Sequence, residues 1–322
     1  MQAKPLLWIT FYLPDHLIEP LKPFVDVKCW QDPTNDMPQQ EFEVAAYEAD
    51  ILWTVVPNRL TADVIQRASR LKMVANLAVG YNNIDVEAAK EAGIIVTNTP
   101  DVLADTTADL AFALMLAAGR RMIESAKALY QGQWAGWQVL GFTGQDIHHK
   151  TLGIIGMGDI GELVAKRAQG FDMKVLYHNR NRKETAEMRY GVTYRSKEDL
   201  LRESDFVIVL TPLTAETRNL IAKEQLALMK PTAILINVAR GGIVNEDDLY
   251  DALVNGTILA AASDVFVQEP VPTTHPLLSL SNFTPMPHIG SATVDTRLAM
   301  VDRNVASLTA YLSNEDIPYR VV

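Results

Sequence analysis

Three residues with chemically active side chains come after predicted strands in the last third of the chain. Arg240 follows Ile-Leu-Ile-Asn-Val-Ala, Glu269 ends Asp-Val-Phe-Val-Gln-Glu, and His288 opens His-Ile-Gly-Ser-Ala. An arginine binds a carboxylate through paired hydrogen bonds, and a histidine transfers a proton near neutral pH. A carboxylate beside a histidine orients the ring and favours its protonated form. These residue types therefore suit acid–base chemistry on a small anionic substrate.

The ends of the strands decide whether these side chains meet. In an open parallel sheet, ligands bind at the carboxyl ends of the strands, so we expect all three side chains to open on that edge. Taken singly, each has an ordinary alternative: Arg240 as a surface cap, Glu269 as a turn residue, and His288 as a loop histidine with satisfied hydrogen bonds.

A glycine-rich turn in the middle of the chain predicts a dinucleotide site. The apolar run 152–155 is typical of a buried strand, and Gly156-x-Gly158-x-x-Gly161 follows it at the start of a helical pattern. In this fingerprint the first glycine permits a tight turn, the second admits a pyrophosphate, and the third lets the helix pack on the strand. The N-terminus of the helix supplies free N–H groups to the phosphates. Ordinary turns also contain glycines, but the surrounding strand–helix order favours the site.

The residues after the second strand of this domain choose between NAD and NADP. An acidic residue there binds the ribose 2′-OH of NAD, whereas neutral or basic side chains accommodate the 2′-phosphate of NADP. The strand ends at Tyr177, and Glu184 is the first acid after it. Between them lie three cations, Arg180, Arg182 and Lys183. We therefore favour NADP(H), with NAD(H) possible; the ordinary alternative is a solvated basic loop.

Alternating strands and helices must position these side chains. In the first hundred residues we expect strands at 6–10, 25–29, 50–54, 71–76 and 94–97, and helices at 14–21, 41–48, 61–69 and 86–92. After the glycine turn we expect strands at 174–177, 206–210, 233–238, 259–263 and 283–286, and helices that include 198–203, 223–229, 246–255 and 292–312. The alternation predicts an α/β fold with two doubly wound parallel sheets.

A long apolar helix separates the two halves of this pattern. Thr106-x-x-Asp109 resembles a capping box, so we expect the helix to start there. It should be buried on nearly all sides, and it joins either two domains or two subunits. One predicted face consists of Leu110, Ala113, Leu114 and Ala117. The loop at 130–150 follows, where Trp134 and Trp137 either anchor the loop or form part of a substrate or dimer contact.

Composition excludes several classes of partner. The 322 residues carry 29 Lys and Arg against 39 Asp and Glu, and a net charge of −10 argues against nucleic acid and anionic membranes. One cysteine, Cys29, allows no internal disulfide, which favours the cytoplasm. The residues at 1–10 do not resemble a signal peptide, and the longest apolar run, 110–118, is too short to span a bilayer. We expect no metal site, and His148 and His149 are interpreted as surface residues.

The motifs together resemble the D-isomer-specific 2-hydroxyacid dehydrogenases. The matching segments are Ala-Arg-Gly after a strand, Asp-Val-Phe-x-x-Glu-Pro, Pro-His-Ile-Gly-Ser-Ala, the substrate loop at 78–85 and the interdomain helix after Pro100. The resemblance covers essentially the whole chain. Within the family, the segments at 97–100, 150–156 and 287–293 look like glyoxylate/hydroxypyruvate reductases. Asp159 departs from the pattern, because the family usually has a basic residue in the glycine turn.

The resemblance implies a role for each residue. Arg240 would bind the substrate carboxylate and polarise the carbonyl, His288 would protonate the carbonyl oxygen, and Glu269 would keep His288 protonated and oriented. The N–H groups of Val79 and Gly80 would hold the other side of the carboxylate. Asp264 would contact the nicotinamide amide. Cofactor contacts would come from Thr106, Gly156, Met157, Gly158, Asp159, Ile160, Gly161, Asn179, Arg180, Asn181, Arg182, Thr211, Pro212, Val238, Ala239, Arg240, Asp264, His288 and Gly290.

The resemblance also implies a layout and a reaction. A flavodoxin-like substrate-binding domain would comprise 1–100 and 291–322, a Rossmann dinucleotide-binding domain would comprise 101–290, and homodimers would form through the cofactor domains. The reaction would be NAD(P)H-dependent reduction of glyoxylate and hydroxypyruvate to D-2-hydroxy acids. The alternatives are a 2-ketogluconate reductase of the same family and a catalytically weak nucleotide-sensing binding protein.

Overall fold

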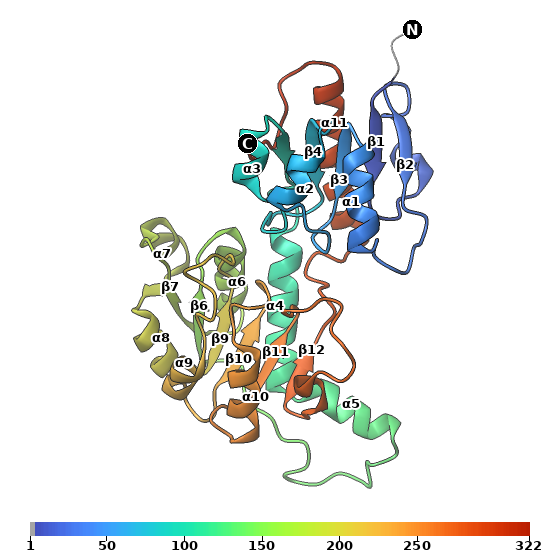
Figure 1. The fold of residues 1–322 in the computed structure, drawn as a ribbon. Helices are drawn as coiled ribbons and strands as arrows, with labels where there is room; N and C mark the ends of the chain where they lie inside the picture. The colour runs from blue at the N-terminus through green and yellow to red at the C-terminus, as the bar shows by residue number, and fades with distance from the viewer. Residues whose placement is uncertain (1–3) are drawn as a thin grey trace. The chain divides into compact units, whose positions relative to one another are not determined.

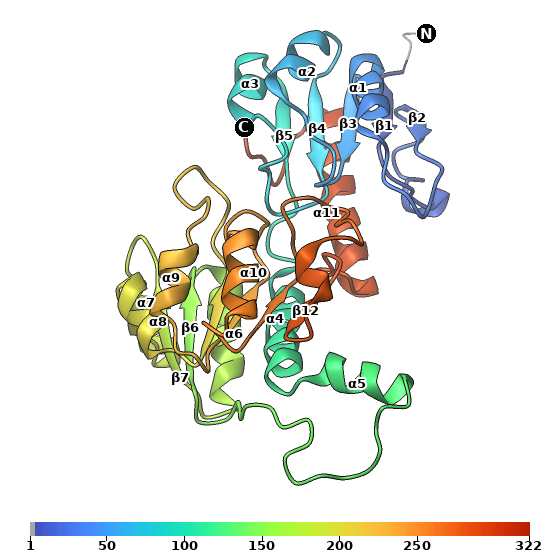
Figure 2. The ribbon, with the colours of Figure 1, turned by 60° about the horizontal axis from the view of Figure 1, so that its bottom comes forward.

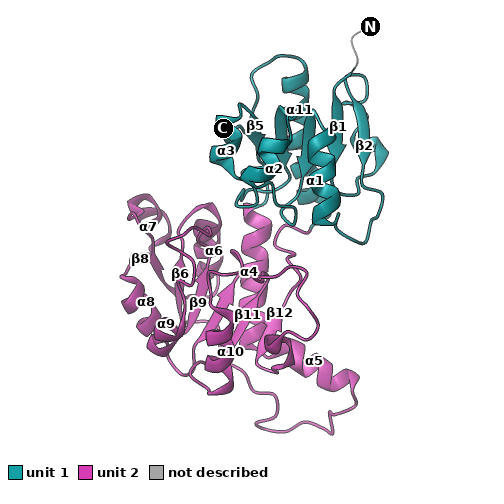
Figure 3. Cartoon of the chain, viewed as in Figure 1, with its two compact units in different colours: residues 1–103, 293–322 teal, residues 104–292 magenta. Residues whose placement is uncertain are grey.

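The computed structural model describes residues 4–322, and the chain divides into two compact units. One unit is formed by Met1–Leu103 with Thr293–Val322, and the other by Ala104–Ala292 (Figure 3). Residues 1–3, part of the segment 1–10 that does not resemble a signal peptide, lie outside the described residues. Each unit contains one wholly parallel sheet, as the strand–helix alternation predicts.

The first unit has a five-stranded sheet in the order β2-β1-β3-β4-β5 (Figure 2). This is the strand order of flavodoxin-like folds. Its strands are β1 (Leu6–Ile9), β2 (Asp26–Cys29), β3 (Ile51–Thr54), β4 (Met73–Asn76) and β5 (Ile95–Thr97). Its helices are the 3-10 turn η1 (Asp15–Leu17), α1 (Gln39–Glu48), α2 (Ala62–Arg67), α3 (Val86–Glu91) and α11 (Val294–Leu312).

Side chains of this sheet alternate between two hydrophobic clusters. Ile51 and Trp53 of β3 pack in a cluster with Met300 and Leu308 of α11, whereas Leu52 packs in the cluster that includes residues of α1, α2 and α3. Since successive residues of a strand point to opposite faces, the sheet is covered on both. The C-terminal helix therefore belongs to the core of the N-terminal strands.

The second unit has a seven-stranded sheet in the order β12-β11-β10-β9-β6-β7-β8 (Figure 1). Its strands are β6 (Thr151–Ile155), β7 (Lys174–His178), β8 (Thr193–Tyr194), β9 (Phe206–Val209), β10 (Ile234–Asn237), β11 (Ala260–Ser263) and β12 (Phe283–Pro285). The order reverses between β6 and β9, which is where doubly wound sheets bind ligands.

Helices flank the strands of the second unit. They are α4 (Ala104–Gly119), α5 (Met122–Tyr130), α6 (Asp159–Gln169), α7 (Glu184–Tyr190), α8 (Lys197–Glu203), α9 (Lys223–Leu228), α10 (Glu246–Val254) and the 3-10 turn η2 (Pro276–Ser279). Apolar residues of α4 and α6 pack in one cluster with alternate residues of the strands, and those of α8, α9 and α10 pack in the other.

Three local predictions were wrong. The segment 14–21 forms only the short turn η1, because Pro20 removes a backbone donor and cannot sit inside a helix. The helix α4 begins at Ala104, so Thr106 is its third residue and not its N-cap; Asp109 forms an ion pair with Arg167 of α6 at 2.6 Å. Within α4, Ala113 is exposed, and the buried residues include Ala108, Ala111 and Met115.

The segment between α5 and β6 is irregular, as predicted. Trp134 and Trp137 are 57% and 82% exposed, so they do not anchor the loop to the core. Within residues 4–322, no helix combines the length and apolar content that a membrane span requires.

Candidate active site

Three neighbouring strands end beside one another at the carboxyl edge of the second sheet. β10 pairs in parallel with β11, and β11 with β12. Arg240 comes three residues after β10, Asp264 directly follows β11, and His288 comes three residues after β12. The shared direction of the strands places these three residues at one edge of the sheet.

Glu269 and His288 form a hydrogen-bonded pair. Oε2 of Glu269 lies 2.6 Å from Nδ1 of His288, and Oε1 accepts the N–H of Phe266 at 2.8 Å. Burial raises the pKa of Glu269, but the hydrogen bond and charge of His288, the Phe266 N–H and the charge of Arg240 together bring it below its usual range. An ionised carboxylate only accepts hydrogen bonds, so Nδ1 carries a proton and Nε2 is the opposite ring nitrogen.

Asp264 fixes the turn that carries His288. Its two carboxylate oxygens accept the N–H groups of Ile289 and Gly290, each at 2.8 Å, and its carbonyl accepts the N–H of His288. Its side chain is almost fully buried, and burial raises the pKa of this carboxyl. His288 has φ = 54°, an uncommon conformation for a residue with a side chain. Asp264 therefore holds a strained backbone around the imidazole, a contact that the sequence did not reveal.

Arg240 is held by the end of its own strand. The side chain of Asn237 donates to the carbonyl of Arg240 at 3.1 Å and accepts the N–H of Ala239 at 3.1 Å, and the guanidinium donates to the carbonyl of Ala239 at 2.7 Å. Burial lowers the pKa of Arg240, and the charge of Glu269 opposes that effect. Because arginine stays protonated in proteins, the site holds a half-buried cation near the carboxylate of Glu269.

The glycine turn has the geometry that its sequence predicts. Gly156 has φ = 107°, and a Cβ there would lie 2.8 Å from the backbone of Leu210. A Cβ on Gly161 would lie 2.3 Å from the carbonyl oxygen of Gly156, so only glycine fits against the strand. A Cβ on Gly158 would meet no protein atom within 4 Å, which leaves that side of the turn open. The residues present therefore fit a dinucleotide pyrophosphate at the N-terminus of α6.

Asp159 is exposed at the first position of α6. A carboxylate in the first turn interacts favourably with the helix dipole, and exposure keeps it hydrated. The helix dipole and the surrounding solvent therefore both favour the carboxylate of Asp159 at this position.

The basic loop after β7 is partly committed to internal contacts. Arg182 forms two hydrogen bonds with Glu187, at 2.7 and 2.6 Å, and the hydroxyl of Tyr177 donates to the same carboxylate at 2.6 Å. The ion pair with Arg182 is the main cause that lowers the pKa of Glu187 to about 2. Arg180 and Lys183 form no ion pair with any described residue, so they are the available cations of this loop.

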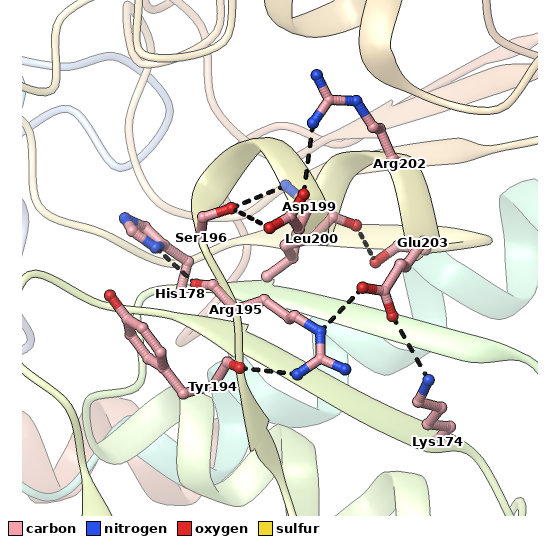
Figure 4. Close-up of polar contacts among 10 residues, drawn as sticks. Lys174, His178, Tyr194, Arg195, Ser196, Asp199, Leu200, Arg202 and Glu203 are labelled. Carbon is pink, nitrogen blue, oxygen red and sulfur yellow. Dashed lines mark hydrogen bonds and ion pairs between the residues drawn. The ribbon is translucent and has the colours of Figure 1, made fainter.

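A polar network supports the end of β7 where this loop begins (Figure 4). Nδ1 of His178 lies 3.0 Å from the carbonyl oxygen of Arg195, and Nε of Arg195 donates to Glu203 of α8 at 2.9 Å. Lys174, at the start of β7, lies 3.5 Å from the same carboxylate. The edge strand and α8 are thereby tied to β7 at both of its ends.

The other predicted cofactor residues also lie in the second unit. Met157 lies in the glycine turn and Ile160 in the first turn of α6, and the N–H of Met157 donates to the side chain of Asn179 at 3.3 Å. Thr106 is in the first turn of α4, while Thr211 and Pro212 follow β9, Val238 and Ala239 follow β10, and Gly290 follows β12. Asn181 is an exposed residue of the basic loop. Within residues 4–322, no three His, Cys, Asp or Glu side chains are grouped to hold a metal.

The loop after β4 in the first unit presents free backbone N–H groups. The carbonyls of Ala78, Val79 and Gly80 accept hydrogen bonds from the N–H of Thr99 and the side chains of Asn98 and Asn76, at 2.9, 2.9 and 3.0 Å. In a trans peptide the C=O and N–H point in opposite directions, so the next three N–H groups are turned away from these donors. None of them donates a hydrogen bond within the described chain. Sequence reasoning missed both asparagines.

The sequence profile described as "D-isomer specific 2-hydroxyacid dehydrogenase, NAD binding domain" matches residues 112–290. The glyoxylate reductase of Thermococcus kodakarensis is 44% identical over 98% of this chain and 95% of its own. The TT0316 protein of Thermus thermophilus superposes with a TM-score of 0.91, at 40% identity over 98% of this chain and all of that one. The NADPH-dependent glyoxylate/hydroxypyruvate reductase of Sinorhizobium meliloti, solved with NADP and malonate, superposes with a TM-score of 0.87. It is 31% identical over 99% of this chain and 97% of its own.

The chain belongs to the D-isomer specific 2-hydroxyacid dehydrogenases, which makes it an NAD(P)-dependent oxidoreductase. Within that family its sequence is of the glyoxylate reductase type.

Proposed function

We propose that the protein reduces small 2-keto acids, glyoxylate and hydroxypyruvate, to D-2-hydroxy acids with NADPH. The observation that carries the proposal is the Glu269–His288 pair, whose Oε2 and Nδ1 atoms are 2.6 Å apart. The pair lies at the carboxyl edge of the second sheet, the edge where Arg240 and the glycine turn also lie. A 2-keto acid presents a fixed negative charge beside an electrophilic carbonyl, and this site offers a cation and a proton donor.

Each side chain has one task in the proposed reaction. Arg240 binds the carboxylate and polarises the carbonyl, which fixes the plane of the substrate. When bound, the nicotinamide cofactor supplies a hydride to the carbonyl carbon. Nε2 of His288 donates a proton to the carbonyl oxygen, which completes the hydroxyl, and the carboxylate of Glu269 stabilises the protonated ring before this transfer.

The two units have separate proposed roles. Ala104–Ala292 is the dinucleotide-binding domain, with the open side of Gly158 and the N-terminus of α6 holding the pyrophosphate. The other unit is the substrate-binding domain, and its N–H groups at Val79 and Gly80 bind a carboxylate. Their support is the orientation imposed by Asn98 and Asn76.

The preference for NADPH is proposed from the loop after β7. Arg180, together with Asn179, Asn181 and Lys183, is available to the 2′-phosphate, whereas Arg182 is paired with Glu187. In Arg180→Ala, the KM for NADPH should rise and the KM for NADH should stay as in wild type. An equal effect on both cofactors would contradict the assignment.

A homodimer is also proposed, formed through the dinucleotide-binding unit. Large apolar side chains are exposed along α5 and the segment after it: Met122, Leu129, Tyr130, Trp134, Trp137, Val139, Leu140 and Phe142. So many exposed large apolar side chains within one short stretch of chain are typical of an interaction surface. Light scattering of wild type and Trp137→Ser tests it, and a monomeric wild type would contradict it.

The function is tested by initial rates of NADPH and NADH oxidation with glyoxylate, hydroxypyruvate and 2-ketogluconate. Fast NADPH oxidation with the two small acids is the expected result. Faster turnover of 2-ketogluconate would change the substrate and keep the mechanism. Cofactor binding without any turnover would instead favour a nucleotide-sensing protein.

A further inference from the structure

The segment from Asp264 to Glu269 lies between two carboxylate–imidazole pairs. One is Glu269 with His288. The other is Glu246 with His275, whose Oε2 and Nε2 atoms are 3.2 Å apart. The second pair has no part in the reaction proposed above. Its two side chains are 18% and 17% exposed, so it is not an ordinary surface ion pair.

Consecutive backbone amides connect the two pairs. The N–H of Phe266 donates to Oε1 of Glu269 at 2.8 Å, and the N–H of Val267 donates to Oε1 of Glu246 at 2.7 Å. Glu246 therefore binds the N–H of the Phe266–Val267 peptide, and Glu269 binds the N–H of the peptide before it.

Glu246 is the first residue of α10, where an acidic side chain also stabilises the helix dipole. That ordinary role needs no distant partner. Here both oxygens are used by other segments of the chain, one by the backbone of Val267 and the other by the ring of His275. The side chain therefore ties three segments together.

The two ring nitrogens of His275 lie in different surroundings. Its Nδ1 atom is buried and has no hydrogen-bond partner in the described part of the chain, while Nε2 faces Glu246. A proton on Nδ1 would be a buried donor without an acceptor, which is costly. The ring therefore donates through Nε2, and it also contacts the ring of Phe266 edge to face, with centroids 5.8 Å apart.

The peptide that Glu246 holds also touches the segment of Arg240. A Cβ built on Gly241 would lie 2.0 Å from the carbonyl carbon of Phe266 and 2.4 Å from the nitrogen of Val267. The two backbones are thus packed without space for any side chain. A shift of the Phe266–Val267 peptide would therefore move both Gly241, which is next to Arg240, and Glu269, whose carboxylate accepts the hydrogen bond of His288.

We propose that Glu246 and His275 are positioning residues for the reduction, acting through the Phe266–Val267 peptide on both Arg240 and Glu269. This inference rests on the proposed function. The pair holds the relative placement of the carboxylate-binding cation and the proton-donating imidazole, where an error of ~1 Å costs up to about 100-fold in rate.

The test compares wild type, Glu246→Ala, Glu246→Gln and Asp146→Ala as full-length proteins, by initial rates with glyoxylate and NADPH. Asp146 is the matched control, since it forms an exposed pair with His148 at 3.9 Å in the same unit. We expect Glu246→Ala to lower kcat roughly 10- to 100-fold while the KM for NADPH stays near wild type. Glu246→Gln keeps an oxygen for the Val267 N–H and should recover most of the rate.

If Glu246 has a purely structural role, the Glu246→Ala protein will have a lower melting temperature but the wild-type kcat at a temperature where the variant is folded. That result would overturn the inference. If Glu246→Ala does not fold, His275→Phe replaces it, because phenylalanine keeps the contact with Phe266 and removes the donor. An unchanged kcat in His275→Phe would likewise overturn the inference. Absence of turnover in wild type would refute the proposed function itself.

Discussion

Replacement of Glu269 by glutamine preserves the size of the side chain and removes its charge. The carboxylate lies 2.6 Å from Nδ1 of His288, and the two side chains are 27% and 33% exposed. With charges ~4 Å apart and an effective dielectric constant of about 20, the carboxylate stabilises the protonated ring by roughly 4 kcal/mol. Screening by solvent reduces this to roughly 1.5–3 kcal/mol, the usual range for a charged hydrogen bond. The expected loss in rate at neutral pH is about 10- to 100-fold.

The assay is the initial rate of NADPH oxidation with glyoxylate at several pH values. Asp63→Asn serves as the control, because Asp63 forms an exposed ion pair with Arg67 at 3.7 Å in the first unit and has no role in the proposed site. The wild-type rate should exceed that of Glu269→Gln across the pH range tested, because the pKa of Glu269 lies below its usual range and its carboxylate stays ionised there. A variant as fast as wild type at neutral pH would refute the role of the pair.

Other predictions test separate contacts. Arg240→Ala should lose most reductase activity while NADPH binding, followed by fluorescence, is retained; normal turnover would remove Arg240 from the site. Asn98→Ala removes the donor to the carbonyl of Val79, worth about 1 kcal/mol, so the KM for glyoxylate should rise roughly fivefold, and an unchanged KM would contradict the loop's role. The ion pair with Arg182 lowers the pKa of Glu187 to about 2 from 4.5, so its stabilising effect is complete above pH 4.5 and is lost as the pH falls towards 2. Urea unfolding of wild type and Glu187→Gln should therefore differ at pH 7 and converge near pH 2, and a constant difference would contradict this.

Much of the fold follows from local sequence patterns. Buried strands such as β9 and β10 are apolar runs bounded by turns, and the order of strands, glycines and helices specifies the doubly wound sheets. The pattern fails where the signal is short or contradictory. β8 has only two residues, and the segment 14–21 has helical apolar spacing that Pro20 overrides.

The contacts that support the site were not readable from the sequence. Strand ends locate Arg240 and His288, because position along a strand is a local property. The links from Glu246 to Val267 and His275 cross 21 and 29 residues and exist only after the chain has folded. The contact of Arg182 was not readable either. Its charge predicts that it binds a phosphate, whereas in the structure it forms an ion pair with Glu187.

The discontinuous first unit has a consequence for synthesis on the ribosome. Its five strands leave the ribosome early, but α11, which covers Trp53 and other apolar residues of one sheet face, is made only after the whole second unit. At 5–20 residues per second, translation of the intervening unit delays that helix by roughly 10–40 s. During this interval a nascent chain exposes half of a hydrophobic core, so the dinucleotide-binding unit should complete its folding first and chaperones should bind the N-terminal strands.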